Sequence, residues 1–302
     1  MIDGGDGADI MNGGDGNDSL HGGGGADNLQ GAGGDDMINA GGDADMIDGG
    51  DGDDALFGGA GNDQFAGGAG ADEIDGQGGN DTMTGGDGAD SVTGGIGEDV
   101  ILESGDANFT LSDDSLITDD GSPETDQLIG VENAELTGGE SDNTIDASEF
   151  DGDTTIRGGA GDDQLTGGGG ADVIDGGADD DQLSIGDATY ADVDGGAGTD
   201  SLAITGSAVS LDLTAVAAED LTNIESIDLT GSGDNILTAS QAEILAIGDG
   251  DVLIVNGNAG DSFTLGAEAG WTWTGTTGGT HHKLVNGSAT AQIAFAVSAT
   301  PD

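Results

Sequence analysis

The chain has 302 residues, of which 65 are glycine and 62 are aspartate or glutamate, and its formal net charge is −60. Arg157 and Lys283 are the only lysine or arginine residues, which excludes nucleic-acid binding and anionic-lipid binding through basic clusters. Aromatic residues make up 3% of the chain and cysteine is absent, so neither a large conventional core nor disulfides are available. A chain of this charge needs cations to become compact, and a hard divalent cation with oxygen ligands is the simplest candidate.

Residues 4–102 are eleven consecutive nonapeptides without an insertion, beginning GGDGADIMN and GGDGNDSLH. Glycine fills position one and position four in ten repeats each. Position eight is always apolar: Met11, Leu20, Leu29, Ile38, Ile47, Leu56, Phe65, Ile74, Met83, Val92 and Ile101. Position six is always aspartate: Asp9, Asp18, Asp27, Asp36, Asp45, Asp54, Asp63, Asp72, Asp81, Asp90 and Asp99.

Each nonapeptide predicts a short strand around position eight, whose apolar side chain faces inward, followed by a glycine-rich turn. We expect two nonapeptides to form one coil, so that residues 18 positions apart stack on each other. The aspartates then form two ladders, one on each edge of a parallel β-roll. One edge carries Asp9, Asp27, Asp45, Asp63, Asp81 and Asp99, and the other carries Asp18, Asp36, Asp54, Asp72 and Asp90.

The stacked carboxylates require a counter-charge. At the strand spacing of about 4.8 Å, neighbouring charges repel by roughly 3 kcal/mol at an effective dielectric near 20. A calcium ion between successive coils replaces this repulsion with coordination by aspartate oxygens and turn carbonyls. The ladders leave five and four gaps, which predicts about nine calcium ions in this block. Magnesium fits less well because it demands octahedral geometry and retains water.

The eleven nonapeptides of residues 4–102 resemble the RTX, or haemolysin-type, calcium-binding repeat GGxGxDxUx, where U is a large apolar residue. The resemblance implies a parallel β-roll that binds calcium. It also implies export in an unfolded state by a type I secretion system, followed by folding in calcium-rich medium outside the cell. The alternative of a flexible acidic linker does not explain an apolar residue at every ninth position.

The motif returns after an interval. Three further repeats at residues 158–184 keep aspartate at position six, namely Asp163, Asp172 and Asp181. Residues 185–194 form a longer segment that places Tyr190 at position six, which predicts a break in the ladder. A single repeat at residues 195–203 then offers Asp200 as a further metal ligand.

Four repeats depart from the pattern of glycines. Ala32 and Gln77 stand at position two, and Asp43 and Asp179 stand at position four. If these positions require positive φ, a residue with a side chain is strained there.

Four regions follow from these patterns. Residues 1–102 are expected to form a calcium-binding β-roll, residues 103–157 an irregular β-solenoid connector, and residues 158–203 a second short β-roll. A small separate β-domain is the alternative for residues 103–157. Residues 204–302 are expected to form a β-rich flanking region with an antiparallel cap, and they resemble segments flanking the repeats of large bacterial RTX adhesins.

No catalytic residue is identified. The chain has three histidines and lacks the HExxH and GxSxG motifs, so we expect no enzymatic activity. We expect a secreted or cell-surface calcium-binding module with a structural or adhesive role and no membrane insertion, since no apolar window of about 20 residues is present. Trp271 and Trp273 raise the alternative of a carbohydrate ligand, although such residues more often cover a core. The alternative function is a secretion and stabilisation module of an exported hydrolase or epimerase whose catalytic domain lies outside this chain.

Overall fold

A computed structural model describes residues 1–215, 220–239, 247, 254–257, 261–265, 272–274, 282–286 and 289–293. Two compact units divide the chain: Met1–Leu136 with Glu149–Asp153, and Thr137–Ser148 with Thr154–Asp302. The elements with assigned bounds in both units are β-strands. Within the described residues, no helix has the length and apolar character needed to cross a membrane.

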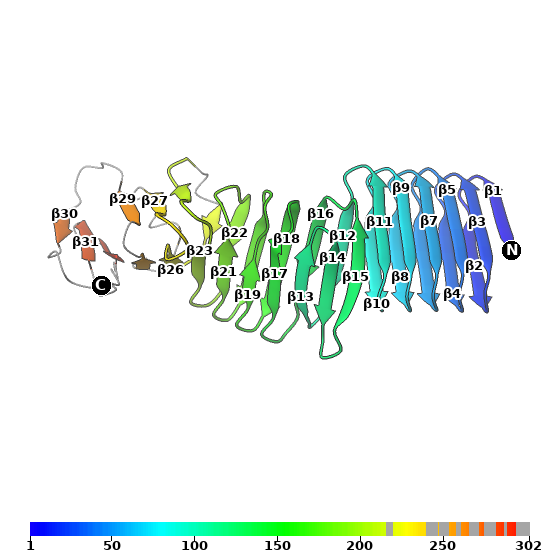
Figure 1. Cartoon of the computed structure of the whole chain (residues 1–302), viewed down its shortest axis with the longest axis horizontal. Coiled ribbons are helices and arrows are strands. Elements are labelled where there is room, and N and C mark those ends of the chain that lie inside the picture. Colours follow the sequence, from blue (N-terminus) through cyan, green and yellow to red (C-terminus); the bar gives the residue numbers. More distant parts are fainter. Residues whose placement is uncertain are drawn as a thin grey trace. The chain divides into compact units, whose positions relative to one another are not determined.

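The first unit contains two sheets (Figure 1). In the order of neighbouring strands, one sheet consists of β1 (Ile2–Asp6), β3 (Ser19–Gly24), β5 (Met37–Gly42), β7 (Ala55–Ala60), β9 (Glu73–Gly78), β11 (Ser91–Ile96), β15 (Glu124–Ile129), β14 (Ser115–Asp119) and β13 (Asn108–Ser112). The other sheet consists of β2 (Ile10–Asp15), β4 (Asn28–Gly33), β6 (Met46–Asp51), β8 (Gln64–Ala69), β10 (Thr82–Asp87), β12 (Val100–Ser104) and β16 (Asn133–Thr137).

Parallel pairing in the first unit joins residues 18 positions apart. In β3 and β5, Leu20 is paired with Ile38, and in β6 and β8, Ile47 is paired with Phe65. Successive nonapeptides therefore alternate between the two sheets, and two of them complete one coil. The predicted parallel β-roll is confirmed.

The interior of the roll is formed by the apolar residues at position eight. Leu29, Leu56 and Ile74 are each 0% exposed, and Phe65 is 5% exposed. Their neighbours alternate with them on the outer face, as the period of a strand requires. Burying one such side chain stabilises the fold by about 1.5–3 kcal/mol, so the two in each coil provide a thin core.

The turns require positive φ at position two and position four. Ala32 and Gln77 at position two have φ of 85° and 69°, and Asp43 and Asp179 at position four have φ of 74° and 80°. In residues 4–102, the glycines at these two positions also have positive φ, which glycine adopts without a steric cost. The strain expected at the four substituted positions is therefore present.

A hairpin interrupts the regular coils of the first unit. β11 pairs in parallel with β15, with Val92 opposite Leu128, although 36 residues separate the two. The strands β13 and β14 lie between them in sequence and pair antiparallel with each other, and β14 also pairs antiparallel with β15. Phe109 at 1% exposure and Leu111 at 0% anchor the hairpin in the interior.

The second unit contains further parallel sheets. One consists of β17 (Thr144–Glu149), β19 (Gln164–Thr166), β21 (Gln182–Ile185), β23 (Ser201–Ile204), β26 (Ser226–Asp228) and β28 (Ile254–Asn256). A second consists of β18 (Asp153–Ala160), β20 (Val173–Ala178), β22 (Asp192–Asp194) and β25 (Leu221–Thr222). A third consists of β24 (Ser210–Asp212), β27 (Ile236–Ala239) and β29 (Ser262–Leu265).

The C-terminal strands are antiparallel, as expected from the sequence. They are β30 (Thr272–Thr274), β31 (His282–Asn286) and β32 (Ala289–Ile293). Trp271, one of the two tryptophans considered for carbohydrate binding, lies outside the described residues.

Candidate metal sites along two rows of aspartates

The position-six aspartates are linked from coil to coil by one repeated hydrogen bond. The backbone N–H of each aspartate donates to Oδ1 of the aspartate 18 residues later, as in Asp36 to Asp54 at 2.7 Å and Asp63 to Asp81 at 2.8 Å. Nine such links, all of 2.7 to 2.8 Å, connect the eleven aspartates of the first unit into the two predicted ladders.

The second carboxylate oxygen of most position-six aspartates has no hydrogen-bond partner within the described protein. Oδ2 is buried and unpaired in Asp9, Asp27, Asp36, Asp45, Asp54, Asp63, Asp72, Asp81, Asp90, Asp99, Asp181 and Asp200. A buried carboxylate oxygen without a donor is costly, so a row of them indicates a missing positive charge.

Glycine at position one leaves the space in front of this oxygen. A Cβ at Gly31 would collide with Oδ2 of Asp36 and with the carbonyl oxygen of Gly49 in the next coil. An equivalent pair of oxygens borders Gly4, where an added Cβ would lie 2.5 Å from Oδ2 of Asp9 and 2.8 Å from the carbonyl oxygen of Gly22. Two acceptors that face each other without a donor are stabilised by a cation between them.

Burial makes the charged form of these carboxylates unfavourable. The pKa of Asp54 is raised to about 6, mainly by burial, with a smaller contribution from the charges of Asp72 and Asp36. The hydrogen bond from the Asp36 amide acts in the opposite direction. Asp45, Asp72, Asp81 and Asp90 show the same shift to about 6. A bound cation would remove this electrostatic cost.

The donor set matches a hard cation. Within the described residues, no three histidine, cysteine, aspartate or glutamate side chains converge on one point. Each gap between coils therefore offers one or two carboxylates, and backbone carbonyl oxygens must complete the coordination. Calcium accepts six to eight oxygen ligands of this kind in flexible geometry, whereas a zinc site needs convergent nitrogen or sulfur ligands. The residues present fit calcium.

Two acidic residues that we had not predicted as ligands extend the ladders of the first unit. Asp90 N–H donates to Oδ1 of Asp126 at 3.0 Å, and Asp99 N–H donates to Oε2 of Glu132 at 3.0 Å. The separations are 36 and 33 residues, so the regular spacing does not find them. A local signal exists for Asp126, because residues 126–130 read DQLIG and residues 163–167 of a true repeat read DQLTG.

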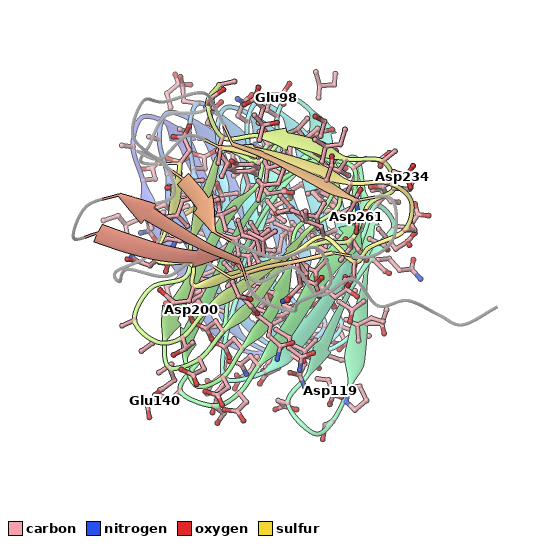
Figure 2. All side chains as sticks on the ribbon, turned by 90° about the vertical axis from the view of Figure 1, so that its left-hand side faces the viewer. Glu98, Asp119, Glu140, Asp200, Asp234 and Asp261 are labelled. Carbon is pink, nitrogen blue, oxygen red and sulfur yellow. The ribbon has the colours of Figure 1, made fainter. Side chains whose placement is uncertain are left out.

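The second unit contains a ladder of the same type. The amide of Asn143 donates to Oδ1 of Asp163, Asp163 to Asp181, and Asp181 to Asp200, at 2.7 to 2.8 Å. Asp200, which is labelled in Figure 2, is thus in line with the repeats before it. Asp200 N–H then donates to Oε2 of Glu225 at 2.7 Å. The separations along this ladder are 20, 18, 19 and 25 residues.

The other edge of the second unit is shorter. The hydroxyl and amide of Thr154 donate to Oδ1 of Asp172 at 2.7 and 3.1 Å. The amide of Ala191, the residue after Tyr190, donates to the Asp172 carbonyl at 2.8 Å, so Tyr190 stands where the next aspartate would be. The interruption expected at Tyr190 therefore affects one edge only, and the ladder through Asp181 and Asp200 continues.

A second set of links at position five runs in the opposite direction. Oδ1 of Asp53 accepts from the amide of Ala71 at 3.0 Å, and Oδ1 of Asn62 accepts from the amide of Asn80 at 3.0 Å. Oδ1 of Asn80 in turn accepts from the amide of Glu98, whose side chain lies at the outer margin of the roll in Figure 2. These exposed hydrogen bonds connect neighbouring coils and need no cation.

The RTX calcium-binding nonapeptide repeat matches in four copies, at residues 3–38, 30–65, 66–101 and 150–183. No curated protein matches the sequence. Among solved structures, the crystal structure of extracellular lipase LipA from Serratia marcescens is similar with 15% sequence identity and a TM-score of 0.17, covering 92% of this chain and 39% of the lipase chain. The aspartate ladders described above are thus built from RTX calcium-binding nonapeptide repeats, which this chain carries.

Proposed function

We propose that the chain is a secreted calcium-binding repeat protein that folds on calcium outside the cell and serves as a structural or adhesive module. The observation that carries this proposal is the row of buried Oδ2 atoms, most of which lie beside a carbonyl oxygen of the next coil, as Asp36 lies beside Gly49. Calcium between these oxygens makes metal-binding energy part of the folding energy.

The proposed ligands are the position-six aspartates of both units. In residues 1–102 these are the eleven aspartates of the two ladders, and the nine linked gaps correspond to about nine ions. In residues 158–203 they are Asp163, Asp172, Asp181 and Asp200. Residues 103–157 act as a connector in this proposal, and residues 204–302 as the flanking region.

An extracellular site of action follows from the same chemistry. Sites made of one or two carboxylates and several carbonyls have the low charge count of calcium modules with dissociation constants of about 10⁻⁴–10⁻³ M. Such sites fill in calcium-rich medium and stay empty where free calcium is low. The net charge of −60 keeps the calcium-free chain expanded, which suits export before folding.

A calcium titration followed by far-UV circular dichroism tests the proposal. We expect mainly disordered signal in chelator and a β-sheet signal when calcium is added, with magnesium at the same concentration giving little change. A chain that shows the full β signal in chelator would contradict calcium-driven folding.

A further inference from the structure

The contact between β24 and β27 repeats the bonding pattern of the aspartate ladders with an asparagine in place of an aspartate. The amide of Val209 donates to Oδ1 of Asn235 at 2.8 Å, and the amide of Ile236 donates back to the Val209 carbonyl at 2.8 Å. The regular coils make the same two bonds, the first of which joins the amide of Asp36 to Oδ1 of Asp54 at 2.7 Å. Asn235 therefore stands where a regular coil has its position-six aspartate.

The sequence around Asn235 is a nonapeptide of the same type. Residues 230–238 read TGSGDNILT, which keeps glycine at positions two and four and an apolar residue at position eight. Gly233 at position four has a φ of 88°, and Leu237 at position eight is 0% exposed. Asparagine at position six thus removes the charge from the place where the eleven repeats of residues 4–102 carry one.

The ladder continues from Asn235 into the next coil. The amide of Asn235 donates to Oδ1 of Asp261 at 2.8 Å, and Asp261 is labelled in Figure 2. Both separations along this ladder, from Val209 to Asn235 and from Asn235 to Asp261, are 26 residues. Asn235 is therefore a middle member of a ladder and not a residue at its end.

The second polar atom of the Asn235 side chain has its own partners. Asn235 is 0% exposed, and its Nδ2 donates to the carbonyl of Leu229 at 3.1 Å and to the carbonyl of Gly206 at 3.4 Å. In Asp54 the corresponding atom is an oxygen, Oδ2, which is buried without a hydrogen-bond partner in the described protein. The amide nitrogen thus supplies the donor that the carboxylate oxygen lacks.

We propose that the side-chain amide of Asn235 replaces both an aspartate and its calcium ion, so that the contact between β24 and β27 needs no metal. The neutral amide accepts from one coil and donates to backbone carbonyls, which leaves no buried charge for a cation to neutralise. The chain then contains two kinds of contact between coils. One kind needs calcium and the other is complete without it, and the residue at position six decides which kind forms.

The inference rests on calcium binding between the regular coils, and Asn235→Asp tests it by a gain of binding. The substitution places a carboxylate oxygen beside the carbonyls of Leu229 and Gly206, and buried oxygens that face each other in this way require a cation. Calcium bound to the full chain is counted by equilibrium dialysis with metal analysis at saturating calcium. We expect Asn235→Asp to bind about one ion more per chain than the wild type.

Asn62→Asp is the matched control for this gain. Asn62 is exposed at position five, and its Oδ1 accepts from the amide of Asn80, a bond that an aspartate can also accept. The control therefore adds the same charge to a nonapeptide outside the buried ladder. Its ion count should equal that of the wild type.

Hydrogen exchange followed by mass spectrometry reports on the contact itself. In Asn235→Asp, protection of the Val209 and Ile236 amides should require a higher calcium concentration than in the wild type, and saturating calcium should restore it. Asn235→Ala removes the acceptor and the donor together. Its protection should therefore be reduced at every calcium concentration, with no restoration by calcium.

The outcomes separate this inference from calcium-driven folding. If Asn235→Asp gains no ion, whether or not it folds, the position cannot take the ion that the amide is proposed to replace, and the inference is wrong. Unchanged protection in Asn235→Ala also contradicts it, because the side chain then does not hold the two strands together. Either result leaves the proposed function intact as long as the wild type binds calcium. A wild-type chain that binds no calcium contradicts the proposed function itself.

Discussion

The amide of Asp36 donates to Oδ1 of Asp54 at 2.7 Å, whereas Oδ2 of the same Asp54 is buried beside the carbonyl oxygen of Gly67 in the following coil. One carboxylate thus contacts two coils with its two oxygens. The first oxygen fixes the side chain by a hydrogen bond, and the second is the one that we propose binds calcium. Hydrogen bonding and metal binding can therefore be tested separately.

Asp54→Asn should weaken calcium binding while preserving the link to Asp36, because the amide oxygen still accepts a hydrogen bond. Asp54 borders two gaps, so we expect a loss of about two ions and a higher calcium midpoint for folding. Asp53→Asn is the control, since Asp53 is exposed and its Oδ1 accepts from Ala71. Isothermal calorimetry measures both variants, and equal ion counts for the two would contradict the ligand assignment.

Ile74→Asp should raise the calcium midpoint although Ile74 binds no metal. Ile74 is 0% exposed, so the change removes an apolar contact and buries a charge at a cost of roughly 3 kcal/mol or more. Glu73→Asp changes the exposed neighbour and should leave the midpoint nearly unchanged. The midpoint is read from circular dichroism during a calcium titration. The same midpoint for both variants would mean that the inward face has been assigned incorrectly.

Gln77→Gly should lower the calcium midpoint. Gln77 has a φ of 69°, and the left-handed region costs a residue with a Cβ roughly 1–2 kcal/mol, partly offset by the greater freedom of glycine when unfolded. We expect a net gain of up to about 1 kcal/mol. Gln64→Gly, in the strand β8, should instead destabilise the roll by about 0.5–1 kcal/mol. Urea denaturation at a fixed calcium concentration gives the change in the free energy of unfolding for both variants. A lower stability of Gln77→Gly would contradict backbone strain at this position.

Acid should favour the compact state of the calcium-free protein. The pKa values of Asp54, Asp72 and Asp81 are raised from 3.8 to about 6, chiefly by burial. A folded-state pKa above the unfolded value stabilises the fold fully below the unfolded pKa, and this contribution is lost as the pH rises through the folded pKa. In chelator, the β signal should therefore increase as the pH falls from about 7.5 to about 4.5.

With calcium present, we expect the β signal to decrease as the pH falls, because protons then compete with the cation for the same oxygens. Parallel circular dichroism titrations with chelator and with calcium provide the comparison. A calcium-free chain that loses β signal on acidification would contradict the burial of these carboxylates.

The periodic part of the fold was predictable from sequence because its determinants repeat without interruption. Aspartate at position six and an apolar residue at position eight specify the strand, its inward face and the stacking distance of 18 residues. Both the register of Leu20 with Ile38 and the burial of Phe65 follow from this pattern. The cost of Gln77 could also be anticipated, because position two is otherwise glycine in most repeats.

The extensions of the ladders were not predicted because they depend on which later segment of the chain packs against the regular coils. The spacing of the sequence repeat does not contain this information. Asp126 takes its place only because β15, which follows β13 and β14 in the chain, pairs with β11. Glu132 and Glu225 use a longer side chain to reach the same kind of amide.

The links between coils join residues separated by 18, 19, 20, 25, 33 or 36 positions with the same amide-to-carboxylate contact. The contact thus constrains only the two residues that meet and leaves the length of chain between them free. Additional peptide can itself join the sheet, as β13 and β14 show, since they continue it beyond β15 with Phe109 and Leu111 buried. The roll is in this sense a frame in which the length of chain between two linked residues can vary while the contact that joins the coils is kept.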